Sequence, residues 1–218
     1  MKVASFVPVI GPITPDAVDG VPGLAEAVSF WTHGRPAAEW FREMEECWGT
    51  AGFVVRRGDK VQGFVIYGPP ERFPRARSYP VGPLAEEGAM LAYVGGDVRT
   101  RRRLLVRMLR ELRIRGVATV EAVASDRERP HHVPTRFMIQ SGWRPVRHAP
   151  LVGYTLVRTE LGSAVEVGEL ARALVGKVRL PSLKRKVPNP GILARADGDT
   201  APLARRPRRR ARGAVSPS

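Results

Sequence analysis

Apolar positions over roughly the first 160 residues repeat at the spacings of helices and strands. In residues 101–113, four leucines and a methionine recur every three or four positions, which predicts an amphipathic helix. Residues 37–48 carry tryptophans, a phenylalanine and a methionine on one face and predict a second helix. The same pattern predicts further helices over 24–31, 135–141 and 163–175.

The predicted strands are short apolar runs bounded by glycine and proline. Residues 89–94 (AMLAYV) form an unbroken apolar run, which is typical of a strand buried on both faces. Arg57-Gly58-Asp59-Lys60 separates two such runs and indicates a hairpin. The runs predict strands over 3–10, 53–56, 61–67, 89–94, 117–124, 143–146 and 151–158.

The strand at 89–94, the helix at 101–113 and the strand at 117–124 form a crossover unit, which makes its two strands parallel neighbours. The predicted class is therefore α/β, with a central mixed β-sheet flanked by helices. Residues 1–176 are predicted to form this domain. Residues 177–218 have no periodicity and six prolines, so they are expected to be a disordered tail.

The charge of the chain is concentrated in two segments. The 218 residues carry a formal net charge of +15, which suggests an anionic partner. The tail accounts for +10 of it, and residues 99–115, with eight arginines and one glutamate, account for +7. The remainder of the domain is slightly acidic. The charge therefore describes a near-neutral domain with one arginine-rich segment and a basic tail, which suggests non-specific contact of 177–218 with nucleic acid.

Composition excludes several classes of site. Cys47 is the only cysteine, so an intramolecular disulfide or a cysteine-based zinc site is excluded, and we expect a buried thiol. The paired histidines at 131–132 lack a third ligand at matching spacing, so no metal is expected. No apolar run approaches the roughly 20 residues that span a bilayer. We therefore expect a cytoplasmic protein with no membrane partner.

Four segments, in this order and at these distances, resemble the GNAT superfamily of acyl-CoA-dependent N-acetyltransferases. The resemblance covers residues 28–160. The segments are GDKVQGFVIYGPP in the hairpin, AMLAYVGGDV in the central strand, LLVRMLRELRIRGVATVEA in the following helix and strand, and TRFMIQSGWRPV near the end of the domain.

This resemblance implies an enzyme that moves an acetyl or other acyl group from acyl-CoA, its co-substrate, to an amine. It implies that backbone groups at the start of the arginine-rich helix hold the cofactor pyrophosphate. It also implies that the central strand pairs with the pantetheine arm. The cofactor-binding residues that the resemblance suggests are Ala92, Tyr93, Val94, Arg99, Thr100, Arg101, Arg102, Arg103 and Leu104.

Two positions depart from the family pattern. The family's cofactor loop contains glycines, whereas this chain has none between Gly96 and Gly116. Two interpretations stay open: the arginines block the approach of backbone to pyrophosphate, or they bind it as charged donors. Met138 stands where many members carry a tyrosine used as general acid, which leaves that role to Tyr93 or Tyr154.

The candidate catalytic residues each have a structural alternative. Glu86 and Glu87 precede the central strand, where a base is expected, but also suit a solvated turn. Glu121 lies within a strand and is a base or the partner of an arginine. A neutral His131 suits a base near pH 7. The candidates are Glu86, Glu87, Glu121, His131 and Tyr154.

The sequence predicts an N-acyltransferase acting on an unidentified amine. The alternative is a catalytically degenerate protein of the same fold that serves as a binding or adaptor protein, in which the basic tail contacts nucleic acid or the ribosome. Fold alone does not choose between them, because function depends on the site.

Overall fold

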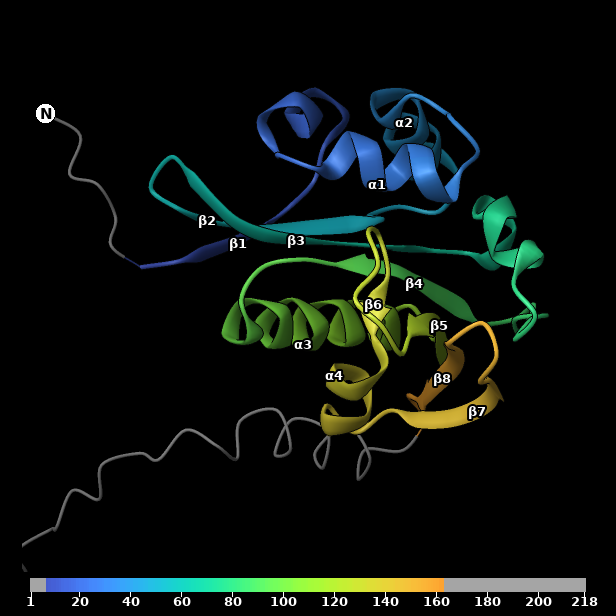
Figure 1. Cartoon of the computed structure of the whole chain (residues 1–218). Coiled ribbons are helices and arrows are strands. Elements are labelled where there is room, and N and C mark those ends of the chain that lie inside the picture. The colour runs from blue at the N-terminus through green and yellow to red at the C-terminus, as the bar shows by residue number, and fades with distance from the viewer. Residues whose placement is uncertain (1–6, 163–218) are drawn as a thin grey trace, which may run out of the picture. The chain divides into compact units, whose positions relative to one another are not determined.

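The computed structural model describes residues 7–162 (Figure 1). The predicted helix at 163–175 and the basic tail lie outside the described residues, as does the first part of the strand predicted at 3–10. Eight strands form one mixed sheet in the order β1-β2-β3-β4-β5-β8-β7, with β6 paired to β5. The strands are β1 (Val9–Pro12), β2 (Gly52–Arg57), β3 (Lys60–Gly68), β4 (Ala89–Val94), β5 (Thr119–Ser125), β6 (Val133–Pro134), β7 (Arg144–Ala149) and β8 (Tyr154–Glu160).

Helices cover both faces of the sheet, with α1 and α2 on one face and α3 and α4 on the other (Figure 1). The helices are α1 (Leu24–Trp31), α2 (Ala37–Cys47), α3 (Val98–Ile114) and α4 (Thr135–Gln140), with 3-10 helices η1 (Pro15–Gly20), η2 (Pro70–Arg72) and η3 (Pro74–Ser78). Each face has its own hydrophobic cluster. The predicted α/β class with a mixed sheet flanked by helices is confirmed.

The hairpin and the crossover unit form as predicted. β2 and β3 are antiparallel neighbours around the turn at residues 58–59. β4 and β5 are parallel and are joined through α3. The first strand differs from its prediction: it begins at Val9 and runs to Pro12, and it lies at the sheet edge against β2. Within the described residues, no helix is long and apolar enough to cross a membrane.

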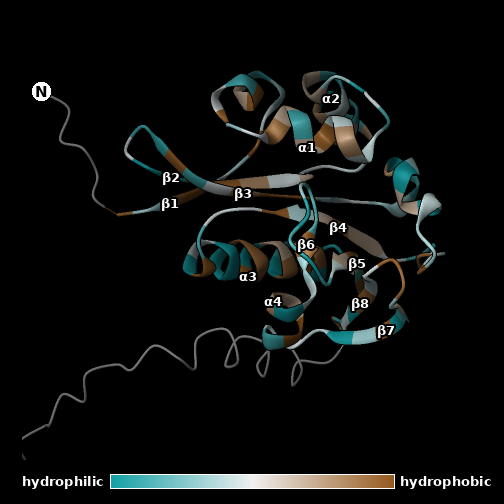
Figure 2. Ribbon diagram, viewed as in Figure 1, coloured by the Kyte–Doolittle hydropathy of each residue, from teal (hydrophilic) through white to brown (hydrophobic). Residues whose placement is uncertain are grey.

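Helix α3 packs its apolar stripe on the sheet and turns its arginines outward, which Figure 2 shows as brown and teal sides. The stripe predicted from the sequence is buried: Leu104, Leu105, Met108, Leu109 and Leu112. The helix ends before Gly116, whose φ of +77° suits a residue without Cβ. Its start differs from the prediction by three residues, because Asp97 caps the helix and allows it to begin at Val98.

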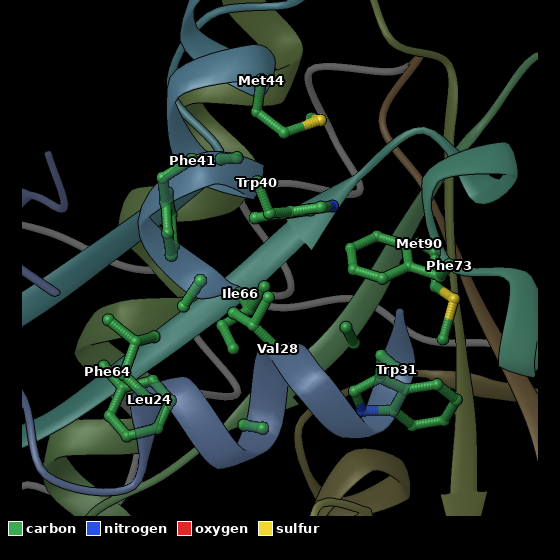
Figure 3. Close-up of a cluster of buried hydrophobic side chains, with 14 of the residues drawn as sticks. Leu24, Val28, Trp31, Trp40, Phe41, Met44, Phe64, Ile66, Phe73 and Met90 are labelled. Carbon is green, nitrogen blue, oxygen red and sulfur yellow. The ribbon is translucent and has the colours of Figure 1, made fainter. Parts of the chain in front are cut away.

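The opposite cluster is built around aromatic side chains of α1 and α2 (Figure 3). Trp31 and Trp40 are fully buried there, as expected of core residues. Cys47, in contrast, is exposed, and the expectation of a buried thiol is wrong. It lies one turn after Glu43, on a side of α2 where both residues contact Arg72 rather than the core.

Candidate functional site

The parallel strands β4 and β5 part near the middle of the sheet. They pair only at Ala89 with Val120 and at Met90 with Glu121. Farther along, β5 pairs with β6 instead, through Ala124 and Ser125. The β4 backbone after Met90 therefore has no partner strand on its β5 side among the described residues. Unpaired strand edges of this kind can pair with an extended ligand.

A bulge lies in β4 at the same place. Ile66 of β3 pairs with Tyr93, and Tyr67 pairs with Leu91, so Ala92 is an extra residue in β4. A bulge bends its strand and increases the local twist. The bulge thus accompanies the divergence of β4 from β5, and it lies within the Ala92–Val94 segment that the resemblance assigned to the cofactor.

A cavity of about 450 Å³ lies at the end of β4. Its charged lining is mostly basic, since three arginines face one glutamate. This balance favours an anionic ligand. The lining residues are Tyr93, Val94, Arg101, Arg127, Glu128, Arg129, Pro130, His131, His132 and Pro134.

The N-terminus of α3 is capped by the carboxylate of Asp97. Asp97 Oδ1 accepts a hydrogen bond of 2.7 Å from the backbone N–H of Thr100. Hydrogen bonds from the backbone and hydroxyl of Thr100, then from the backbone of Arg99, hold the pKa of Asp97 below its usual value. Only three residues, 95–97, connect β4 to this helix. A negative group therefore occupies the helix end to which the resemblance assigns the pyrophosphate.

The residues predicted for cofactor binding divide between core, surface and cavity. Thr100 and Leu104 are buried, whereas Arg99 and Arg103 are exposed. Arg102 is half-buried, and its Nε has no hydrogen-bond partner. Of the six predicted residues on α3, the cavity lining includes only Arg101, whose Nε donates to the Gly96 carbonyl at 2.6 Å.

Glycines let β3 approach the turn between β4 and α3. A Cβ on Gly63 would lie 2.3 Å from the carbonyl oxygen of Gly95 and 2.9 Å from Thr100 Cγ2. Gly96 has φ of +108°, and a Cβ there would lie 2.6 Å from the Gln62 carbonyl oxygen. No side chain larger than hydrogen fits at either position without movement of the backbone.

The acidic candidates do not converge on the cavity. Glu86 and Glu87 are exposed in the turn before β4. Glu121 is buried, and its Oε1 accepts hydrogen bonds of 2.9 and 2.7 Å from Nε and Nη2 of Arg158. Its Oε2 accepts a bond of 2.7 Å from the backbone N–H of Ala85. Glu121 thus has the arginine partner of its structural alternative, and it fastens the segment before β4 to the β5–β8 ladder.

The histidine and tyrosine candidates do lie together. His131 and His132 line the cavity, and the His131 carbonyl accepts a hydrogen bond of 3.0 Å from Trp31 Nε1. The His131 ring lies 5.1 Å from that of Phe30. The Tyr154 ring lies 5.3 Å from the ring of His132. These contacts join the end of α1 to the segment before β6.

Sequence reasoning missed Tyr79 in this aromatic group. Its ring packs edge-to-face on Tyr154, with centroids 4.8 Å apart, and its hydroxyl contacts His132. Nothing near Tyr79 in the sequence indicates a site, because both of these partners lie more than 50 positions away. Arg129 was also missed; it donates to the Tyr154 hydroxyl, and its guanidinium lies 4.4 Å from that ring.

Met138 offers no substitute for the family's tyrosine. It lies on α4, is fully buried, and belongs to the cluster on the α3 face of the sheet. A thioether has no proton to donate. Met138 therefore supplies no hydroxyl for proton transfer.

The mixed sheet, the parted central strands and the crossover helix define a protein with the GNAT fold. An N-acetyltransferase from Staphylococcus aureus Mu50 matches with a TM-score of 0.52 and 13% identity, over 71% of this chain and 99% of that one. The yncA protein of Salmonella typhimurium, assigned as an acetyltransferase and solved with its cofactor acetyl-CoA, matches with a TM-score of 0.51 and 16% identity. That match covers 72% of this chain and 96% of that one. The sequence significantly matches no protein-family model and no curated protein. The likeness is thus one of fold.

Proposed function

We propose that this protein transfers an acyl group from acyl-CoA to an amine. The observation that carries the proposal is the parting of β4 from β5 after Met90, with a basic cavity at the end of the freed strand. The backbone of Ala92–Val94 would pair with the amide groups of the pantetheine arm. The GNAT fold and the acetyl-CoA bound by the yncA protein support this assignment.

The described residues fit an acyl-CoA in part. Arg101, Arg127 and Arg129 line the cavity and would attract its phosphates. The carboxylate of Asp97 does not suit a pyrophosphate at the start of α3, because two like charges would meet there. We therefore assign phosphate contact to the guanidinium groups rather than to the helix end. In the reaction, the amine nitrogen attacks the thioester carbonyl carbon and loses a proton, a C–N bond forms, the C–S bond breaks, and the thiolate gains a proton.

Turnover can be measured as loss of thioester absorbance from acetyl-CoA. This readout is preferable to a thiol reagent, because the exposed Cys47 would itself react. We expect consumption with at least one amine from a panel of the free amino acids, spermidine and a lysine-containing peptide. Absence of consumption across the panel, together with absence of acetyl-CoA binding, would contradict the proposal.

A second candidate is a binding protein with the GNAT fold and no catalysis. Two observations favour it: Asp97 occupies the helix end, and Met138 replaces the family tyrosine. This candidate predicts that acetyl-CoA, if bound, stays intact with every amine of the panel. Amide product from purified protein would refute it.

The basic tail carries a separate prediction that lies outside the described residues. Its net charge of +10 suggests non-specific, salt-sensitive association with nucleic acid or the ribosome. Deleting 177–218 should abolish such binding to duplex DNA in a low-salt mobility assay. Equal binding by the full and shortened chains would exclude the tail.

A further inference from the structure

Tyr79 and His132 form a hydrogen-bonded pair, and His132 lines the cavity. Tyr79 directly follows η3, and His132 directly precedes β6, so the fold joins residues 53 positions apart. The Tyr79 hydroxyl lies 2.6 Å from His132 Nε2. On the other side of the ring, His132 Nδ1 lies 2.7 Å from the Pro130 carbonyl oxygen.

The chemistry of these partners fixes where the protons are. A carbonyl oxygen can only accept, so His132 Nδ1 must carry a hydrogen and donate it to Pro130. In the neutral ring, Nε2 is then unprotonated and accepts from the Tyr79 hydroxyl. Both ring nitrogens of His132 are thereby engaged. The hydroxyl oxygen of Tyr79 retains lone-pair capacity, and Tyr79 is only half-buried.

We propose that Tyr79 is the catalytic proton-transfer residue of this site and that His132 is the positioning residue that accepts the proton through it. The inference rests on the proposed function. As the amine nitrogen attacks, Tyr79 Oη takes its proton while the hydroxyl proton passes to His132 Nε2. When the C–S bond breaks, Tyr79 gives a proton to the thiolate and regains one from His132. Acyl-CoA and amine become amide and free CoA thiol, with no other reactant.

The surroundings of the pair suit this role. Burial lowers the pKa of His132, the hydrogen bond to the Pro130 carbonyl opposes this, and the neighbouring Arg129, His131 and Arg75 add to the lowering, so the ring is neutral and ready to accept at pH 7. Burial, then the neighbouring Tyr154, raises the pKa of Tyr79, so its hydroxyl stays protonated. The rings of Trp31 and Tyr154 hold the Tyr79 ring at 5.7 and 4.8 Å.

The substitution Tyr79→Phe tests the hydroxyl alone, because the ring and its packing remain. We expect kcat with the best amine of the panel to fall at least about 100-fold, the lower end of general acid–base effects. The Kd for acetyl-CoA should stay within about twofold. Tyr67→Phe is the matched control: its hydroxyl is buried without a partner in the other hydrophobic cluster, and its removal should leave kcat unchanged.

His132→Gln separates positioning from structure. Its amide can still accept from Tyr79 but does not titrate, so we expect a reduced kcat and loss of the acidic limb of the kcat/KM profile below pH 6.5. Nitrogen NMR of the wild type should independently show the tautomer protonated at Nδ1. A ring protonated at Nε2, or full activity in Tyr79→Phe, would overturn the inference.

The outcomes distinguish the two proposals. If the wild type neither binds acetyl-CoA nor consumes it, the proposed function fails and the relay fails with it. If the wild type turns over and Tyr154→Phe, rather than Tyr79→Phe, abolishes kcat, the proposed function stands and only the relay is overturned.

Discussion

Arg158→Ala is expected to destabilise the protein by about 3 kcal/mol, because it leaves a buried carboxylate without its counter-charge. The side chain of Glu121 is only 2% exposed, and Arg158 supplies two of its three hydrogen bonds. Breaking a buried ion pair by removing one partner costs about 3–5 kcal/mol. We take the lower end because the Arg158 side chain is 35% exposed, which lets water reach the vacated space.

A double-mutant cycle tests whether this loss of stability comes from the unpaired charge. Glu121→Gln removes the charge but keeps an acceptor for the Ala85 N–H, so we expect a loss of about 1 kcal/mol. The double variant should be more stable than Arg158→Ala alone, since no charge is left buried. The assay is urea unfolding, with exposed Arg103→Ala as the control. A loss below 0.5 kcal/mol for Arg158→Ala, on the order of an ordinary surface substitution, would refute the reasoning.

Three further predictions concern the helix end, the glycine contact and pH. Asp97→Ala removes the cap of α3 and should cost about 1 kcal/mol in urea unfolding, yet tighten acetyl-CoA binding by removing a negative charge; weaker binding would contradict this. Gly63→Ala should cost about 1–3 kcal/mol, because its Cβ meets the Gly95 carbonyl; unchanged stability would show that the turn moves freely. Because the pKa of His132 is lowered in the folded state, the unfolded chain binds a proton more readily, so stability should fall below about pH 6.5. His132→Gln should remove that part of the pH dependence, and an unchanged profile would count against it.

The sequence predicted the elements that local pattern controls. The apolar stripe of α3 and the unbroken apolar run of β4 each identify their element, because burial of one face or of both faces determines the spacing of apolar residues in the sequence. The turn between them was predicted less well. The helix was predicted over residues 101–113 from its apolar stripe, whereas the cap formed by Asp97 draws residues 98–100 into the helix as well.

The candidate site was less predictable, because its contacts join distant positions. His131 and Tyr154 were found as single residues, since histidine and tyrosine carry chemistry wherever they occur. Tyr79 lies in a proline-rich segment without periodicity, and only the fold brings it against His132. Glu121 was a fair candidate base until its cross-strand partner, Arg158, was identified.

The central claim is that acyl-CoA binds in the opening between β4 and β5, and calorimetric titration with acetyl-CoA tests it most directly. The wild type should bind, and Arg101→Ala should bind at least about tenfold more weakly, as expected for one lost hydrogen bond to a charged group. Arg110→Ala, an exposed arginine on the same helix outside the cavity lining, should bind like the wild type. Equal affinity of all three proteins, or no heat with the wild type at millimolar acetyl-CoA, would contradict the claim.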